Sequence, residues 1–232
     1  MKLPPLCNRL QACCNFIKPG DRVADIGCDH GYLGIHLLLS GIASTVIAAD
    51  VNQQPLDSAL HNAHKYGTAD KMSFYLSDGV KNIPRDFDTL VCAGMGADTM
   101  ISILEAAPWL KSDRYRLVLQ CQSRRPQLRQ YLHEAGFSIT AETLAQDGKF
   151  IYPVMEVMYR PSLPMTPGAY HISPALLADK SPLLPDFYHR VIQGLRTSAD
   201  GLSRSGGEKY EHYKAVLDEL LEMEDTIYGN SG

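Results

Sequence analysis

The chain has 232 residues, of which 45% are hydrophobic and 21% are charged, and its formal net charge is −4. This length and composition allow one full α/β domain with a small appendage, which excludes an intrinsically disordered protein. The acidic balance also excludes a uniformly basic surface, so binding to a nucleic acid would need a local patch of cations.

The cysteines and the amino terminus give no sign of export. The six cysteines form no C-x-x-C pair and no regular spacing, so we expect reduced thiols and no metal site. The segment MKLPPLCNRL lacks the apolar core of a signal peptide, and no run approaches the roughly 18 apolar residues of a membrane span. We therefore expect a cytoplasmic protein without a membrane partner.

Apolar, β-branched segments alternate with amphipathic segments over the first two thirds of the chain. The predicted strands cover residues 22–27, 45–50, 72–76, 89–93, 116–120, 138–144 and 151–159. The helices between them include residues 54–66, 98–107 and 126–135, the last of which ends at Gly136. This alternation predicts an α/β fold with a doubly wound, mostly parallel seven-stranded sheet.

The last two predicted strands are separated only by the link QDGK, whose Asp147-Gly148 pair is a strong hairpin signal. A parallel sheet that ends in an antiparallel hairpin is typical of Rossmann-like class I methyltransferases, unlike the six-stranded NAD-binding fold. We therefore expect residues 1–160 to form a methyltransferase domain.

The composition changes after Arg160. The stretch PSLPMTPGAYHISP predicts a Pro-rich linker over residues 161–175, followed by a helical domain over residues 176–232. In that domain apolar residues recur at three-four spacing on both sides of a break at Ser205, Gly206 and Gly207. The seam residues are Ile192, Leu195, Ala199, Leu202, Tyr210, Tyr213, Leu217, Leu220 and Ile227. They predict an antiparallel, coiled-coil-like helical hairpin, which either packs on the sheet domain or a second copy, or helps to grip a substrate.

The first strand joins its helix through a turn that contains both glycines and acids. Gly27, Gly31 and Gly34 accompany Asp25 and Asp29 in the run VADIGCDHGYLGIHLL. In a dinucleotide site these carboxylates would repel the pyrophosphate, whereas S-adenosylmethionine carries a sulfonium and an ammonium and no phosphate. The turn therefore indicates a methyl-donor site. The alternative is an ordinary connection in which Asp29 caps the helix and the glycines relieve strain.

Acids at two further strand ends favour the methyl-donor interpretation. Asp50 follows the second strand, where a carboxylate can accept hydrogen bonds from both ribose hydroxyls, and Asp78 follows the third, near the expected adenine amino group. Gly94 and Gly96 end the fourth strand and permit close backbone approach. The residues expected to hold the donor are Asp25, Gly27, Asp29, Tyr32, Leu33, Asp50, Val51, Asp78, Gly79, Ala93, Gly94 and Met95.

Several of these motifs together resemble the bacterial TrmK-type tRNA adenosine N1-methyltransferases. The resemblance rests on VADIGCDHGYL, the strand end AAD, SDG and VCAGMGADTMISIL, and it spans nearly the whole chain. It implies a Rossmann-like domain followed by a helical coiled-coil domain, S-adenosylmethionine as the donor, and N1 of adenosine 22 in the tRNA D arm as the acceptor. Two features depart from the family pattern: Gln120-Cys121-Gln122 replaces a Q-P-N-like segment, and Ala97 replaces the usual second glycine after A-G-M-G.

The expected reaction needs positioning more than a strong base, because N1 of a neutral adenine carries no proton. Asp29 is the first candidate to stabilise the positive charge that develops on the ring, with His30 orienting it or the base. Gln120 is the candidate amide for the target base. The competing roles are structural: His30 bonds backbone at a helix start, Tyr32 packs the first helix, Met95 fills the core, and Gln120 is satisfied by neighbouring backbone.

Cations near strand ends and adjoining loops could contact tRNA phosphates. The predicted set is Arg9, Arg22, Arg124, Arg125, Arg129, Lys149 and Arg160. The main rival interpretation is a small-molecule methyltransferase, which the acidic net charge favours and in which the helical appendage would act as a lid or dimer contact. A scaffold with a vestigial fold is a third alternative, opposed by the presence of all the donor-binding acids. The sequence does not indicate whether two chains associate.

Overall fold

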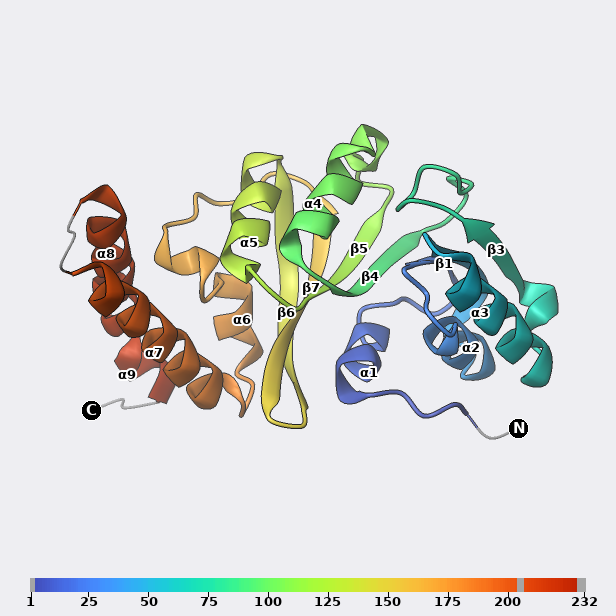
Figure 1. Ribbon diagram of the computed structural model, residues 1–232, viewed down its shortest axis with the longest axis horizontal. Helices are drawn as coiled ribbons and strands as arrows, with labels where there is room; N and C mark the ends of the chain where they lie inside the picture. The colour runs from blue at the N-terminus through green and yellow to red at the C-terminus, as the bar shows by residue number, and fades with distance from the viewer. Residues whose placement is uncertain (1–2, 204–206, 229–232) are drawn as a thin grey trace. The chain divides into compact units, whose positions relative to one another are not determined.

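The computed structural model describes residues 3–203 and 207–228. The chain divides into two compact units, Met1–Ser162 and Leu163–Gly232 (Figure 1).

The first unit is built on a seven-stranded sheet whose order is β3-β2-β1-β4-β5-β7-β6. The strands β1 to β5 are parallel, and β7 runs antiparallel to both β5 and β6. Their bounds are β1 Asp21–Ile26, β2 Ala43–Asp50, β3 Met72–Leu76, β4 Thr89–Met95, β5 Arg116–Cys121, β6 Phe137–Asp147 and β7 Phe150–Tyr159. The predicted class I methyltransferase fold is confirmed, including the antiparallel hairpin at Asp147 and Gly148.

Helices cover both faces of this sheet, which explains why the central strands are almost continuously apolar. The helices are α1 Asn8–Cys14, α2 Tyr32–Leu39, α3 Gln53–Lys65, α4 Ala97–Glu105 and α5 Arg125–Glu134, with short 3-10 helices at Ala69–Lys71 and Pro108–Leu110. Residues of α1, α2 and α3 share one buried cluster with Val23 and Val91, whereas α4 and α5 share another with Ala24 and Leu90. Successive residues within β1, and within β4, therefore face opposite layers of helices.

Helix α1 is the α-helix of this unit that the sequence did not predict. It has only seven residues, and the side chain of its N-cap residue, Cys7, makes no capping hydrogen bond. The cap comes instead from the β6–β7 hairpin, because the backbone N–H of Asn8 donates to Asp147 Oδ1 at 2.8 Å. A helix that depends on a residue 139 positions away leaves no local signal.

The second unit is helical. It contains a 3-10 helix at Gly168–Tyr170, α6 Pro174–Asp179, α7 Leu184–Leu202, α8 Glu208–Leu221 and α9 Glu224–Tyr228. The hydroxyl of Tyr188, near the start of α7, donates to the carbonyl of Leu220, near the end of α8, at 3.0 Å. The two helices are therefore antiparallel, which confirms the predicted hairpin (Figure 1). Of the predicted break, Ser205 and Gly206 lie outside the described residues, and Gly207 directly precedes α8.

The Pro-rich stretch between the last strand and the hairpin contains ordered structure. Glu219 of α8 accepts hydrogen bonds from the Thr166 hydroxyl and from the backbone N–H of Gly168, the latter at 2.9 Å. The segment 161–175 thus includes the 3-10 helix and the first residues of α6. Its prolines prevent long helices but allow short turns anchored by a side chain of the same unit.

Candidate functional site

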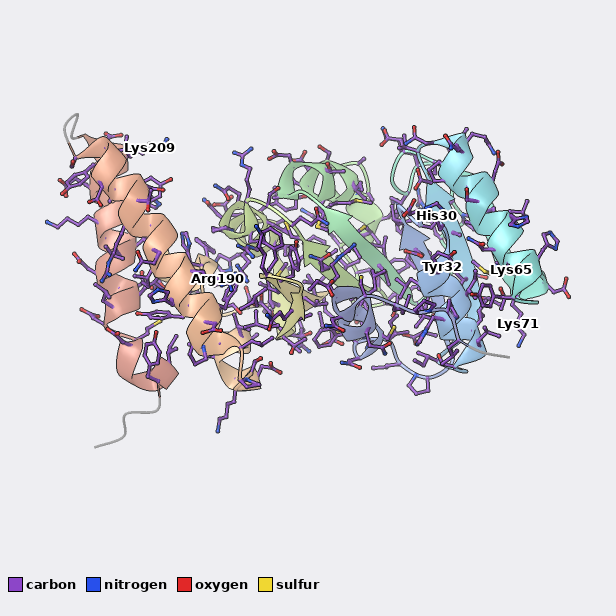
Figure 2. All side chains as sticks on the ribbon, turned by 60° about the horizontal axis from the view of Figure 1, so that its bottom comes forward. His30, Tyr32, Lys65, Lys71, Arg190 and Lys209 are labelled. Carbon is purple, nitrogen blue, oxygen red and sulfur yellow. The ribbon has the colours of Figure 1, made fainter. Side chains whose placement is uncertain are left out.

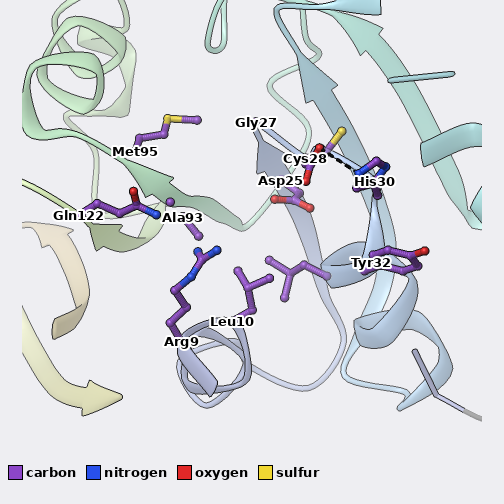
Figure 3. Close-up of a pocket in the computed structure, with 13 residues that line it drawn as sticks. Arg9, Leu10, Asp25, Gly27, Cys28, His30, Tyr32, Ala93, Met95 and Gln122 are labelled. Atoms are coloured by element: carbon purple, nitrogen blue, oxygen red, sulfur yellow. Dashed lines mark ion pairs between the residues drawn. The ribbon is translucent and has the colours of Figure 1, made fainter. Parts of the chain in front are cut away.

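A cavity of about 370 Å³ lies in the first unit at the carboxyl ends of β1 and β4 (Figure 3). This is the edge where open α/β sheets bind ligands. The turn after β1 forms one side, the end of β4 another, and α1 a third. The lining residues are Arg9, Leu10, Asp25, Gly27, Cys28, Asp29, His30, Tyr32, Leu33, Ala93, Gly94, Met95 and Gln122.

The backbone of the β1–α2 turn requires its special residues. Gly27 has φ +74°, which favours glycine, and a Cβ there would lie 2.4 Å from Met95 Cε, so a larger residue would also displace the end of the Met95 side chain. Asp29 has φ +50°, a left-handed conformation that Asp tolerates better than most residues. The turn is tied to β2, because the backbone N–H groups of Gly27 and Cys28 both donate to the Ala49 carbonyl. The sequence prediction that this turn is built around glycine and aspartate is consistent with these geometries.

Asp25 is the most unusual charged group of the cavity. Its side chain is 4% exposed, and within residues 3–203 and 207–228 no group donates a hydrogen bond to its carboxylate. Burial, together with the neighbouring Asp50 and Asp29 carboxylates, raises the pKa of Asp25 to about 7, and burial is the largest of these causes. A cation placed beside Asp25 would relieve both effects, so the cavity favours a positively charged ligand.

The other two predicted strand-end acids lie outside the cavity lining. Asp50 is buried, and its carboxylate accepts from the backbone N–H groups of Asn52 at 2.9 Å and Asp29 at 3.3 Å. It supports the turn and keeps lone pairs for further donors. Asp78 is exposed and pairs with Lys81 Nζ at 2.5 Å. The structure thus brings Asp25 and Asp29 together in the cavity and leaves Asp50 and Asp78 along the same edge of the sheet.

The residues that directly follow Asp50 and Asp78, Val51 and Gly79, lie in different surroundings. Val51 is 62% exposed directly after Asp50, which leaves an apolar surface beside the turn. Gly79 has φ +59°, and a Cβ there would meet Ile103 Cγ1 at 2.8 Å, so this glycine allows the loop to pack against α4. Neither residue lines the cavity.

His30 and Tyr32 lie at the mouth of the cavity, just before and at the start of α2 (Figure 2). His30 Nε2 is 3.6 Å from Asp29 Oδ1, and the His30 carbonyl accepts a hydrogen bond from Asn62 of α3. The rings of His30 and Tyr32 are 6.1 Å apart between centroids. Both predicted roles of these side chains, toward a ligand and toward the helix start, are compatible with this placement.

Gln120 differs from its predicted role. It is 0% exposed and does not line the cavity, so its amide cannot reach a base bound there. Its Oε1 accepts hydrogen bonds from Arg9 Nη1 at 3.1 Å and from the Gly94 N–H at 3.0 Å, both of which belong to lining residues. The exposed amide in the cavity is Gln122, two residues further on, whose backbone N–H donates to the Met95 carbonyl. Gln120 therefore supports the wall, and Gln122 forms part of it.

Three of the predicted phosphate-binding cations do not lie at this edge. Arg22 begins β1, at the opposite edge of the sheet, and is paired with Asp86 and Asp88. Arg160 follows β7, whose end lies beside the start of β5 at that same opposite edge. Arg129 is 1% exposed and paired with Glu142, so burial leaves it no surface for a phosphate. These positions correct the predicted set.

The remaining predicted cations lie nearer the cavity. Arg9 lines it, and Arg124 and Arg125 follow β5 at the carboxyl edge. Arg124 is exposed, with its Nη1 between both carboxylate oxygens of Asp98, whereas Arg125 is partly buried and donates to the Ile151 carbonyl. Lys149 occupies the tip of the β6–β7 hairpin that anchors α1.

Sequence reasoning missed Leu10, Cys28 and Gln122 as cavity residues and assigned Arg9 to another role. Leu10 and Arg9 come from the unpredicted α1, so no periodic signal could place them. Cys28 lies inside the recognised turn and could have been included. Gln122 is the third residue of the segment that departs from the family pattern, which was a usable signal.

The part of the chain that the structure describes contains neither a candidate membrane span nor a candidate metal site. None of its helices is long and apolar enough to cross a membrane. Across residues 3–203 and 207–228, no cluster of His, Cys, Asp and Glu is arranged to hold a metal ion.

A seven-stranded sheet of this order, with an acidic cavity at the carboxyl ends of β1 and β4, defines a class I methyltransferase domain. Residues 6–155 match a family model described as a methyltransferase domain, and the chain belongs to this family.

The resemblance to TrmK-type enzymes is confirmed by individual relatives. The chain is 33% identical over 146 residues to the tRNA (adenine(22)-N(1))-methyltransferase of Bacillus subtilis, an alignment that covers 62% of this chain and 61% of the relative. The chain thus spans about three fifths of the length of the curated relatives it matches.

Solved structures extend the similarity along the chain. A protein of the NADB-Rossmann superfamily from Streptococcus agalactiae superimposes with a TM-score of 0.84 at 27% identity, covering 94% of this chain and 97% of that one. The Streptococcus pneumoniae protein Sp1610, solved in complex with S-adenosyl-L-methionine, gives a TM-score of 0.76 at 26% identity, covering 92% and 100%.

Proposed function

We propose that this protein is an S-adenosylmethionine-dependent tRNA methyltransferase that methylates N1 of adenosine 22 in the D arm. The observation that carries the proposal is the buried carboxylate of Asp25, to which no described residue donates a hydrogen bond, in a cavity lined by Gly27 at the expected edge of a methyltransferase sheet. The relatives in B. subtilis and S. pneumoniae support the acceptor and the donor respectively.

The residues present fit the donor. Asp25 offers an unpaired anion for the cationic groups of S-adenosylmethionine, and its pKa of about 7 falls when a cation binds. Asp50 would accept from the ribose, while the exposed Val51 surface and the region of Asp78 and Gly79 would take the adenine. Ala93, Gly94 and Met95 close the opposite wall.

When bound, the donor supplies a methyl group whose bond to sulfur breaks as a bond to the acceptor nitrogen forms. The sulfonium becomes a neutral thioether, and the positive charge passes to the adenine ring. Asp29, exposed at the mouth of the cavity, would stabilise that charge, and His30 at 3.6 Å would orient the Asp29 carboxylate. Gln122, with its amide exposed in the wall, replaces Gln120 as the candidate contact for the target base.

Cations at the cavity's edge of the sheet would contact the tRNA phosphates. Arg124, Arg125 and Lys149 lie at the same edge of the sheet as the cavity, where phosphates flanking a bound nucleotide would approach. Such a local patch allows RNA binding by a chain whose net charge is −4. A cytoplasmic location follows from the proposed substrate.

One experiment identifies the reaction, the acceptor nucleotide and the methylated atom together. The protein is incubated with labelled S-adenosylmethionine and unmodified tRNA transcripts, and the product is mapped by nucleoside mass spectrometry. We expect 1-methyladenosine at position 22, no label in a transcript with guanosine there, and no label with Asp25→Ala.

The same experiment separates the rival interpretations. Donor binding without label in any tRNA would favour a small-molecule methyltransferase. Absence of donor binding to the wild-type protein would contradict the whole proposal and favour a scaffold.

A further inference from the structure

The cavity has one positively charged wall residue, Arg9, in otherwise acidic surroundings. Its side chain is 26% exposed and extends from α1 toward Ala93, with the Asp25 carboxylate on the adjacent side of the cavity (Figure 3). Nη1 donates to Gln120 Oε1 at 3.1 Å, and Nε lies 3.6 Å from Asp147 Oδ2. Within the described ranges 3–203 and 207–228, Nη2 has no hydrogen-bond partner. One edge of the guanidinium is thus held and another is free to bind.

Two elements far from α1 in the sequence fix the position of Arg9. Gln120 is fully buried, and its Oε1 receives both Arg9 Nη1 and the Gly94 N–H, which sets the orientation of the amide. Asp147 receives the backbone N–H groups of Asn8 at 2.8 Å and Arg9 at 3.3 Å. The hairpin tip therefore anchors the first turn of α1, and β5 anchors the end of the side chain.

The end of β4 is shaped to let Arg9 approach. A Cβ on Gly94 would lie 3.2 Å from Arg9 Nη1, and φ +82° at this residue already favours glycine. The guanidinium thus lies directly against the strand end that lines the cavity, which is where a bound ligand would meet it.

We propose, on the basis of the proposed function, that Arg9 binds the carboxylate at the amino acid end of the methyl donor, and that Gln120 and Asp147 are its positioning residues. An α-amino acid end carries an ammonium and a carboxylate on the same carbon. Within a single cavity, Asp25 offers a negative charge for the ammonium and Arg9 offers a positive charge for the carboxylate. A carboxylate is the natural partner of a preorganised guanidinium edge.

The charge of Arg9 argues against a place beside the target base. The adenine ring becomes cationic as the methyl group is transferred, and a neighbouring guanidinium would raise the energy of that state. The donor's carboxylate lies outside the reacting bond and keeps its charge throughout the reaction. Arg9 can therefore bind it equally before and after transfer, which predicts an effect on affinity and little on kcat.

The test compares two ligands by isothermal titration calorimetry on the full chain. The first is S-adenosylhomocysteine, and the second is S-adenosyl-3-thiopropylamine, which lacks only the carboxylate. We expect Arg9→Ala to lower the affinity for S-adenosylhomocysteine by at least about tenfold, the loss typical of a charge-assisted hydrogen bond. The affinity for S-adenosyl-3-thiopropylamine should fall by less than about twofold. Arg9→Lys should recover part of the loss, and Arg160→Ala is the matched control at the other edge of the sheet.

The positioning residues have their own expected result. Asp147→Asn and Gln120→Met should lower the affinity for S-adenosylhomocysteine by about two- to tenfold and leave the affinity for the carboxylate-free ligand almost unchanged. Equal losses for both ligands in Arg9→Ala would overturn the proposal and make the role structural.

An unchanged affinity for S-adenosylhomocysteine in Arg9→Ala, with a smaller salt dependence of tRNA binding, would also overturn it and assign Arg9 to a phosphate. In that case methylation of tRNA by the wild-type protein keeps the proposed function intact. Failure of the wild-type protein to bind either ligand would overturn both.

Discussion

Asp25 is the residue on which the proposed donor site most depends, because its carboxylate is buried and no described residue donates a hydrogen bond to it. Burial without compensation is costly for an ionised group and persists where function requires it. Its pKa of about 7 means that the ligand-free protein holds Asp25 partly protonated at neutral pH. A bound cation favours the ionised form, so ligand binding and proton release are linked.

The first prediction is a pH dependence of donor affinity. Because Asp25 must lose its proton to attract the ammonium, affinity for S-adenosylhomocysteine should rise with pH through about 7 and level off above it. Between pH 8 and pH 6 we expect a loss of about tenfold, which follows from the fraction of a group with this pKa that is ionised. Calorimetry at fixed ionic strength measures it. Asp25→Asn is the control, since it should bind weakly at both pH values; a wild-type slope retained in Asp25→Asn would assign the titration to another group.

The second prediction concerns the exchange of roles between two glutamines. Gln122 is exposed in the cavity wall and Gln120 is not, so Gln122→Ala should lower kcat for tRNA methylation by about tenfold while leaving the affinity for S-adenosylhomocysteine unchanged. Gln127→Ala, an exposed amide on α5, is the matched control and should behave as wild type. Equal kcat values for Gln122→Ala and wild type would remove Gln122 from the target-base site.

Among the helices and strands, the sequence predicted those that bury apolar surface and missed helix α1, which is held in place by polar contacts. All seven strands overlap their predicted ranges, because the parallel strands β1 to β5 are largely apolar and the antiparallel strands β6 and β7 flank a strong Asp-Gly turn signal. Helix α1 has no such pattern and is fixed by Asp147 of the hairpin. The misplacement of Gln120 has a related cause: a strand buried on both faces hides every side chain until it ends, and Gln122 is the first residue beyond β5.

The predicted cations show the same limit. Strand ends were correctly located, but whether a cation faces solvent, an acid or the core depends on tertiary neighbours. Arg22 meets Asp88, whose pKa it lowers to about 2 through a hydrogen bond, and Arg129 meets Glu142 inside the domain. A sequence pattern alone does not contain these pairings.

The third prediction concerns the helical hairpin of the second unit. Tyr188 donates a buried hydrogen bond to the Leu220 carbonyl, which links α7 to α8. Tyr188→Phe removes that hydrogen bond, while the Leu220 carbonyl keeps the one from the Met223 N–H, and should lower the free energy of unfolding by about 1 kcal/mol. Tyr213→Phe, where the hydroxyl has no hydrogen-bond partner in the described part of the chain, is the control and should change it little. Urea denaturation of both variants measures the difference, and equal midpoints would show that the hydrogen bond contributes nothing.

Of the two compact units of the whole molecule, one contains the entire cavity. Every residue that lines the cavity belongs to the unit Met1–Ser162. The cavity and its supporting residues, including Gln120 and Asp147, are therefore complete within one unit. Donor binding should not require the second unit.

The fourth prediction follows from that division. A chain ended after Ser162 should bind S-adenosylhomocysteine with a Kd within about threefold of the full chain, a difference of less than 1 kcal/mol. Circular dichroism first confirms that the shortened chain is folded, and calorimetry then gives the Kd. If the folded fragment bound the ligand more than about tenfold more weakly, the second unit would have to be part of the donor site.

A crystal structure of the protein grown with S-adenosylhomocysteine would test the proposed donor site most directly. We expect the ligand in the cavity at the carboxyl ends of β1 and β4, with its ammonium beside Asp25 and its carboxylate on Arg9. A cavity without ligand in crystals shown to contain it, or a ligand bound at another edge of the sheet, would contradict the account.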